Sequence, residues 1–296
     1  AGAWRARQRC PVRAGIGGMI WLNGRLVARE QAHIDPADRG LLLADGLFET
    51  LRADRGRIFK LEEHLQRMAE GATELAIPLP LDPPSIAQAV RETLDANQLS
   101  AGDAAIRITL TRGPGQRGLV PPADAKPNLI VSASAYRPPD VEDGFIVVTS
   151  ERARRNEGSV TARLKTLQYL DNIVAQSEAS AADADEALLL NNRSTIACGA
   201  RSNLFAVIKG KLLTPNVGEG ALPGITRATV LRLAKELSMQ VTEAPITVGD
   251  LARAEEMFLT NSLLLVMPVR RCNGSDLPHG PITKRLMQAY SNSTWG

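Results

Sequence analysis

A short proline-rich and polar stretch, Tyr136 to Asp143, most constrains how this chain can fold. Residues of this kind favour loops, because proline lacks a backbone donor and polar side chains prefer water. The chain has 296 residues, enough for two ordinary domains with substantial cores. We therefore expect an N-terminal domain over 19–135, a linker over 136–143 and a larger domain over 144–296.

The first domain has the pattern of a mixed α/β unit. Asn23-Gly24 lies between two apolar runs and predicts a tight hairpin over 20–29, and Arg55-Gly56 predicts a second turn. Apolar and alternating runs predict further elements: strands at 47–51, 104–111 and 128–135, and helices at 61–76 and 84–97.

The second domain alternates strands and helices in the same way. Lys209-Gly210 predicts another hairpin turn, and Pro223-Gly224 ends one segment just before a helix that begins at Ile225. The remaining pattern predicts strands at 145–150 and 185–190, the hairpin over 202–215 and a last helix at 281–290. Over 256–269 it predicts a strand, then a polar Thr-Asn-Ser step and an apolar run. Both halves together predict the α/β class.

The stretch from Arg163 to Ala179 predicts a helix with one lysine, Lys165, at its entrance. Apolar residues recur at spacings of three and four, and Ala175 and Ala179 continue a small-residue side. We expect this helix to pack on a core through its recurring apolar residues, Leu167, Leu170, Ile173 and Val174. A lysine at the edge of a buried helix can lose its proton, since burial disfavours the ammonium, and a neutral amine can bond covalently to a carbonyl. The alternative for a single lysine is a solvated surface charge.

Composition excludes several classes of function. A net charge of +3 and an aromatic content of 4% argue against a nucleic-acid partner. The sequence has no apolar run of about 18 residues, so we expect no membrane span. Its three histidines are widely spaced, and we expect no metal site. The odd number of cysteines favours free thiols and a cytoplasmic location.

Residues 1 to 18 have no apolar periodicity and four arginines. They contain no continuous apolar segment of the signal-peptide type. We expect a disordered extension, with a mitochondrial-type presequence as the alternative.

Three further features suit an anion. Arg67 lies on the predicted helix 61–76, and two arginines, Arg112 and Arg117, lie in a glycine-rich loop. Thr226 lies in the first turn of a helix, where unpaired N–H groups attract anions. Each has an ordinary alternative: a solvated helix charge for Arg67 and a helix cap for Thr226.

Three motifs in a fixed order resemble the class IV aminotransferases, which are pyridoxal-phosphate enzymes of fold type IV. They are Lys165 to Leu170, Ser202 to Phe205 and Leu222 to Arg227. The resemblance covers about Met19 to Tyr290. It implies a two-domain α/β fold, with a small N-terminal domain and a larger domain that has a β-barrel-like core. It also implies a homodimer with the active site at the subunit interface.

The same resemblance implies the cofactor, pyridoxal 5'-phosphate, and its partners. Lys165 would bind the cofactor covalently and move the substrate proton. Arg67, Ile225, Thr226 and Ser262 would bind the phosphate, and Tyr169 would lie near the ring hydroxyl. The substrate would be a small molecule bound by Phe48, Arg117 and Asn261.

One position departs from the family pattern. The family usually has a glutamate paired with the ring nitrogen where this chain has Cys198. A thiol is a weak partner and would not hold a proton on that nitrogen. A weaker electron sink penalises transamination more than a rapid elimination. Another acid, Asp171 or Glu178, could compensate, and an impaired enzyme is a third alternative.

The motif Phe48 to Arg52 and the loop Arg112 to Gly118 resemble the aminodeoxychorismate lyases. The motif Pro281 to Arg285 instead resembles branched-chain aminotransferases. We therefore expect a lyase that releases pyruvate and forms 4-aminobenzoate for folate synthesis. The alternatives are an aminotransferase of D-amino or branched-chain amino acids, and a pyridoxal-phosphate-binding protein with little activity.

Overall fold

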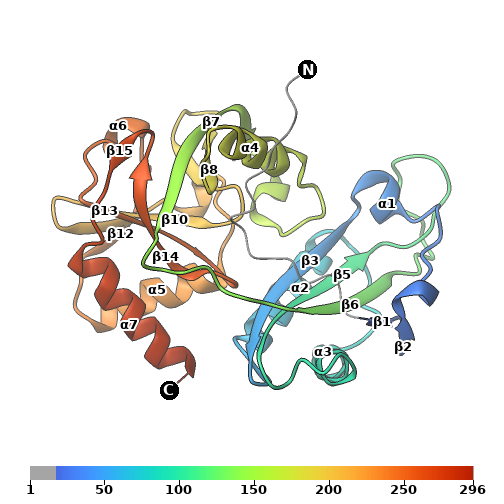
Figure 1. Ribbon diagram of the computed structural model, residues 1–296. Helices are drawn as coiled ribbons and strands as arrows, with labels where there is room; N and C mark the ends of the chain where they lie inside the picture. The colour runs from blue at the N-terminus through green and yellow to red at the C-terminus, as the bar shows by residue number, and fades with distance from the viewer. Residues whose placement is uncertain (1–17, 296) are drawn as a thin grey trace. The chain divides into compact units, whose positions relative to one another are not determined.

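The structure, a computed structural model, describes residues 18–295 (Figure 1). The chain forms two compact units. Of the described residues, the N-terminal unit contains 18–137 and 164–168, and the C-terminal unit contains 138–163 and 169–295. The predicted extension, residues 1–18, lies outside the described residues except for Gly18. The predicted domain boundaries at 136–143 stay a prediction.

The N-terminal unit is built on an antiparallel sheet in the order β2-β1-β6-β5-β3-β4. Both predicted hairpins are confirmed, and their turn residues have positive φ: 49° at Asn23 and 46° at Arg55. The strands are β1 Met19–Leu22, β2 Arg25–Ala28, β3 Gly46–Asp54, β4 Arg57–Ile58, β5 Asp103–Thr111 and β6 Asn128–Ala135.

Two amphipathic helices pack on this sheet, α2 Leu61–Glu74 against β3 and α3 Pro83–Ala96 against β1 and β6 (Figure 1). Asp82 caps α3 by accepting a hydrogen bond from the Ser85 amide at 2.9 Å. The short helices η1 Arg29–Gln31 and α1 Arg39–Leu43 lie between β2 and β3 in the chain. The predicted strands and helices of this half are therefore confirmed to within a few residues.

Residues 164–168 extend this sheet beside the start of β3. Leu47 forms an antiparallel bridge with Thr166, and the Phe48 amide donates to the Lys165 carbonyl at 2.9 Å. The Leu167 amide donates to the Gly46 carbonyl at 3.0 Å. Gly46 is required there, because a Cβ atom would lie 2.3 Å from the Leu110 carbonyl oxygen. This backbone pairing, rather than a helix entrance, holds Lys165.

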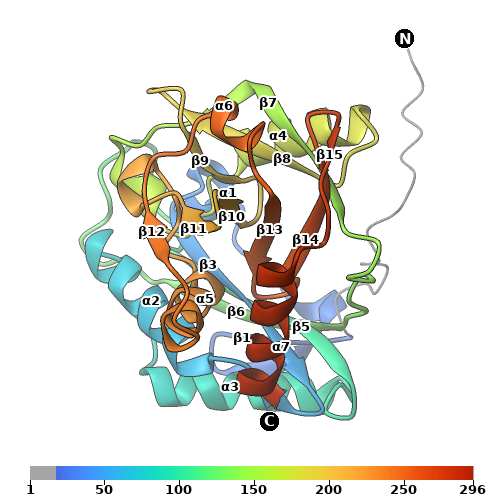
Figure 2. The ribbon, with the colours of Figure 1, turned by 90° about the vertical axis from the view of Figure 1, so that its left-hand side faces the viewer.

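The C-terminal unit is built on a mixed sheet in the order β12-β11-β10-β13-β14-β7-β8-β9, with β15 beside β14 (Figure 2). Strand β7 runs parallel to both of its neighbours. The strands are β7 Phe145–Arg155, β8 Glu186–Asn191, β9 Ile196–Gly199, β10 Asn203–Ile208, β11 Lys211–Thr214, β12 Val241–Glu243, β13 Glu256–Asn261, β14 Leu265–Cys272 and β15 Ser275–Asp276.

Helices flank this second sheet. The helix α4 Leu170–Ala181 packs on β7 and β8, and α5 Ile225–Glu236 and α7 Pro281–Trp295 pack on β13 (Figure 1). The shorter elements are η2 Val160–Arg163, η3 Val217–Glu219 and α6 Val248–Leu251. Within residues 18–295, no helix combines the length and the apolar character needed to cross a membrane.

The predicted packing of α4 is confirmed for its small-residue side and for the partly buried Val174, and is wrong for its two large residues Leu170 and Ile173. Leu170 and Ile173 are exposed, at 74% and 57%, whereas Ala175 and Ala179 are fully buried. Leu167 lies before the helix, in the strand-like segment beside β3. Small residues let the helix axis approach β7 and β8 closely, and the buried Asn172 fixes the approach by donating to the Ala200 carbonyl at 2.6 Å.

This close approach predicts that α4 tolerates no large residue at its buried alanines. Ala179→Leu should lower the free energy of unfolding by about 1–3 kcal/mol, because the added carbons must displace β7 or β8. Ser180→Leu, at the exposed neighbouring position, should change it by roughly 0.5 kcal/mol or less. Guanidinium unfolding at one protein concentration measures both, and equal losses would contradict this packing.

Candidate active site

The predicted site residues divide between the two units. The N-terminal unit carries Phe48, Arg67, Arg117 and Lys165, and the C-terminal unit carries Tyr169, Cys198, Ile225, Thr226, Asn261 and Ser262. Each set has its own geometry.

Lys165 and Phe48 meet in the N-terminal unit. The Lys165 Nζ lies 4.4 Å from the centroid of the Phe48 ring, and the Arg107 Cζ lies 3.9 Å from the same centroid. The ring is buried, with 7% of the residue exposed. Two basic side chains therefore lie against one aromatic ring, a favourable arrangement for a cation.

Arg107 is a residue that the sequence interpretation missed. Strand β5 alternates, and its apolar residues Ile106 and Ile108 point into the core. Arg107 therefore projects from the other side of the sheet, opposite Thr50 of β3 and close to Phe48. The period-two pattern of the strand contained this information.

A buried network, Glu49 with His64 and Arg67, lies next to Phe48. Arg67 donates from Nε at 2.8 Å and from Nη2 at 2.7 Å to the two carboxylate oxygens of Glu49. The Nδ1 of His64 lies 2.7 Å from Glu49 Oε2. The predicted phosphate ligand Arg67 is thus held in one orientation by a carboxylate that the sequence interpretation had not singled out.

This network shifts the pKa of both titratable partners. Burial alone would raise the pKa of Glu49, but hydrogen bonds and charge from His64 and Arg67 lower it to about 2. Burial lowers the pKa of His64 despite the attraction of Glu49. At neutral pH the network therefore contains a carboxylate, a guanidinium and a neutral imidazole.

The two arginines of the glycine-rich loop have different roles. Arg112 is buried and donates to Asp45 and to the carbonyls of Leu75 and Ala76, so its predicted part in an anion clamp is wrong. Arg117 is exposed. Its role as a substrate ligand stays a prediction.

Arg39 holds the loop that carries Arg117. Its Nε donates to Asp45 at 2.8 Å, and its Nη atoms donate to the carbonyls of Gly118 and Leu119 at 2.9 and 3.0 Å. The exposed tip of this loop, 117–120, is therefore fixed from below by a buried cation.

In the C-terminal unit, the first turn of α5 offers free amides. Gly224 is the N-cap and has no side chain to satisfy them. Gly224 also makes room for Asn203, because a Cβ atom here would lie 2.1 Å from Asn203 Oδ1. Thr226 is buried in the same turn, with 2% of the residue exposed. This donor set suits a phosphate.

Asn261 closes the turn after β13. Its Oδ1 accepts hydrogen bonds from the amides of Leu263 and Leu264 at 2.9 and 2.8 Å, and its Nδ2 donates to the Arg201 carbonyl at 3.1 Å. These bonds use the polar atoms of Asn261 within the protein. The substrate role of Asn261 and the phosphate role of Ser262, the next residue, stay predictions.

Cys198 lies on β9 with 6% of the residue exposed. Burial raises the pKa of its thiol, with Arg155 opposing and Glu186 adding to the shift. The predicted compensating acids differ: Asp171 is exposed on α4, and Glu178 accepts from the Ser150 hydroxyl.

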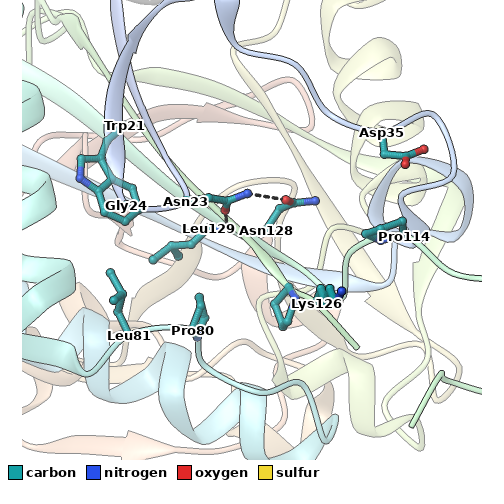
Figure 3. A pocket seen from close by; sticks show the side chains of 11 residues that line it. Trp21, Asn23, Gly24, Asp35, Pro80, Leu81, Pro114, Lys126, Asn128 and Leu129 are labelled. Carbon is teal, nitrogen blue, oxygen red and sulfur yellow. Dashed lines mark hydrogen bonds between the residues drawn. The ribbon is translucent and has the colours of Figure 1, made fainter. Parts of the chain in front are cut away.

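A separate cavity of about 380 Å³ lies in the N-terminal unit (Figure 3). None of the predicted site residues lines it. Its amides are paired with each other, since Asn23 Nδ2 donates to Asn128 Oδ1 at 2.7 Å. We assign no ligand to this cavity.

The low pKa of Glu49 predicts how stability depends on pH. Its folded value is about 2 and its ordinary value 4.5, so its contribution is complete above pH 4.5 and is lost as pH falls towards 2. The shift corresponds to about 3 kcal/mol. Glu49→Gln should lower the free energy of unfolding at pH 7 and flatten its fall below pH 4.5, as measured by guanidinium titration. Glu74→Gln, exposed on α2, should keep the wild-type dependence, and an unchanged fall in Glu49→Gln would contradict the assignment.

Comparison with known proteins identifies the family. A family model described as amino-transferase class IV matches residues 46–272. A Methanocaldococcus jannaschii protein, named provisionally as a branched-chain-amino-acid aminotransferase, is 37% identical over 94% of this chain and 97% of its own. The D-alanine aminotransferase of Bacillus licheniformis is 29% identical over 93% of this chain and 96% of its own.

A solved structure agrees in fold. The branched-chain amino acid aminotransferase of Thermobaculum terrenum, in its pyridoxal-phosphate form, superposes with a TM-score of 0.85 and 27% identity over 94% of each chain. The predicted fold class and cofactor are thereby confirmed. The chain belongs to the class IV aminotransferases, fold-type IV enzymes that use pyridoxal 5'-phosphate.

Proposed function

We propose that this protein is an aminotransferase that exchanges the amino group of a branched-chain or D-amino acid with a 2-keto acid. The observation that carries the proposal is the similarity of nearly the whole chain to a relative named as a branched-chain-amino-acid aminotransferase, at 37% identity. The D-alanine aminotransferases, near 30% identity, leave the enantiomer open to experiment.

The residues present fit the cofactor at its phosphate and aldehyde ends. Within the C-terminal unit, uncapped amides and the Thr226 hydroxyl at the start of α5 match a dianionic phosphate. Within the N-terminal unit, Glu49 orients the Arg67 guanidinium, whose role toward the phosphate stays part of the proposal. Thr260, on β13 close to Ser262, has a buried hydroxyl with no partner among the described residues. At the ring-nitrogen end the partner is the Cys198 thiol in place of a carboxylate.

Lys165 is the residue for which we propose a direct chemical role. Bound pyridoxal phosphate supplies an electron sink for the electron pair of the substrate Cα–H bond. Lys165 would bind its aldehyde and carry the Cα proton. The pairing of its backbone with β3 and the contact of its amine with Phe48 hold this side chain in one place.

Aminodeoxychorismate lyase remains the second candidate, and Cys198 favours it. In that elimination, formation of the aromatic ring drives the electron pair out of the cofactor. The reaction therefore needs a weaker electron sink in the cofactor ring than transamination does. An enzyme impaired at both reactions is the third outcome of the same experiment.

The reaction itself separates these candidates. Protein reconstituted with pyridoxal phosphate should absorb visible light, and amino-group transfer from L-leucine or D-alanine should require an added keto acid. Pyruvate release from aminodeoxychorismate without a keto acid would instead establish the lyase. A loaded protein inactive on all three substrates would overturn both.

Lys165→Ala provides the control. It should lose the visible band and at least about a thousandfold of the rate, because no other amine replaces the covalent bond. Lys126→Ala, a surface lysine, should keep both. If the wild-type protein stays colourless after reconstitution with pyridoxal phosphate, every pyridoxal-phosphate-dependent function is excluded.

We further propose a homodimer in the cytoplasm. Leu119 and Val120, at the tip of the loop fixed by Arg39, are 82% and 86% exposed. Two large apolar side chains held rigidly in water are better explained by a contact with a second copy.

If this loop tip forms the dimer contact, negative charges placed on it should weaken dimerisation. Leu119→Asp with Val120→Asp should weaken dimerisation at least about tenfold, since carboxylates must then be desolvated. Arg91→Asp, exposed on α3, should not. Sedimentation velocity over a concentration series measures the dimer, and circular dichroism verifies the fold. A wild-type monomer, or a double variant as dimeric as wild type, contradicts the assignment.

A further inference from the structure

We propose that Arg155 and Cys198 together keep the ring nitrogen of the bound cofactor unprotonated. The inference rests on the proposed function, in which Cys198 faces that nitrogen. Both side chains belong to the C-terminal unit. Arg155 lies in none of the family motifs described above.

The strand register places both side chains on one face of the sheet. Arg155 pairs with Asn191 of β8, and Cys198 pairs with Leu189 of the same strand. Leu189 and Asn191 are two residues apart, so they point to the same side, and their partners point with them. Arg155 and Cys198 thus flank β8, from strands β7 and β9. They lie near enough for the Arg155 charge to act on the pKa of the Cys198 thiol.

Arg155 has a buried hydrogen-bond donor, Nε, that is not used within the described residues. Its Nη2 donates to the Ala162 carbonyl at 2.7 Å, while its Nε is buried and has no partner among the described residues. A buried donor without an acceptor is energetically costly. An unprotonated pyridine nitrogen has a lone pair that accepts a hydrogen bond. A pyridinium has none and carries a charge of the same sign as the guanidinium.

Cys198 matches the same state of the nitrogen. Burial raises the pKa of the thiol, so it is an S–H group at neutral pH. A thiol is a weak donor that can approach a lone pair but cannot balance a pyridinium charge. Arg155 and Cys198 therefore both disfavour a proton on the ring nitrogen.

The carboxylates around this position are already engaged. Glu186 of β8 accepts hydrogen bonds from the Ser202 hydroxyl at 2.7 Å and the Arg201 amide at 2.9 Å. Glu219 of η3 accepts from Asn191 Nδ2 at 2.8 Å and pairs with Arg193 at 3.1 Å.

On the helix side, Glu178 of α4 accepts from the Ser150 hydroxyl and from the Arg152 amide at 3.2 Å. Asp171 is exposed on the same helix. Each of these acids is either held by its own donors or turned to solvent. None of them substitutes for the carboxylate that the family usually places at position 198.

The ring nitrogen can be observed directly in the holoenzyme. Protein reconstituted with pyridoxal phosphate labelled with ¹⁵N in the ring should give the chemical shift of an unprotonated pyridine at pH 7. Cys198→Glu should move it to the pyridinium shift, because a carboxylate stabilises the charge. Cys198→Ser, which keeps a neutral donor, should leave it unprotonated. A pyridinium shift in the wild type overturns the proposal.

Arg155 is tested by its charge. Arg155→Met should raise the ring-nitrogen pKa by about one unit or more, because a nearby cation no longer opposes the proton. Arg155→Lys, which restores the cation, should titrate like the wild type. If Arg155→Met titrates like the wild type, Arg155 has no such role.

Absorbance separates this inference from the proposed function. A protein without the visible band has failed to bind the cofactor, and the proposed function fails with it. A protein with the band and a protonated ring nitrogen overturns the inference alone. The Cys198 variants keep the test valid if Arg155→Met does not fold.

Discussion

The pairing of residues 164–168 with the start of β3 is the interaction on which the candidate site depends. Two backbone hydrogen bonds, from Phe48 and from Leu167, hold the lysine segment as an extra strand. Backbone bonds of this kind do not depend on side-chain rotamers, so Lys165 is located as firmly as the sheet itself. The same pairing sets the Phe48 ring against the amine, and the pairing of β3 with β5 brings Arg107 to the same ring. Pairing with a strand therefore positions Lys165, although the sequence around it has the periodicity of a helix.

Two carboxylates in the N-terminal unit, Glu49 and Asp45, are each paired with basic side chains. Glu49 is buried with two basic partners, and its carboxylate orients Arg67 through two hydrogen bonds. Asp45 accepts from both Arg39 and Arg112 in the same way. Burying a single charge would be very costly, whereas a paired and hydrogen-bonded one gains directional rigidity. In both places a carboxylate fixes the orientation of arginine side chains.

The elements with a strong local signal could be predicted from the sequence. Strand β6 begins and ends where the apolar run predicted, and the Asn23-Gly24 turn has the dihedral angles that its residues favour.

The face of α4 could not be predicted by counting large apolar residues. Its alanines and Asn172 are buried because the helix lies close to the sheet, and that distance is a property of the tertiary fold. Glu49 was missed for a similar reason: a carboxylate in a strand is recognised as a ligand holder only when its partners, fifteen and eighteen residues away in the chain, are seen beside it.

The lysine strand also has a consequence for the order of synthesis. The chain leaves the N-terminal unit after residue 137 and returns to it only for residues 164–168. While the ribosome makes the intervening 26 residues, the start of β3 lacks its final partner. The N-terminal unit can therefore reach its complete hydrogen-bonded form only after Lys165 has left the ribosomal tunnel. An N-terminal fragment cut at the linker would keep an unpaired strand edge, and a C-terminal fragment would carry the lysine without the strand that holds it.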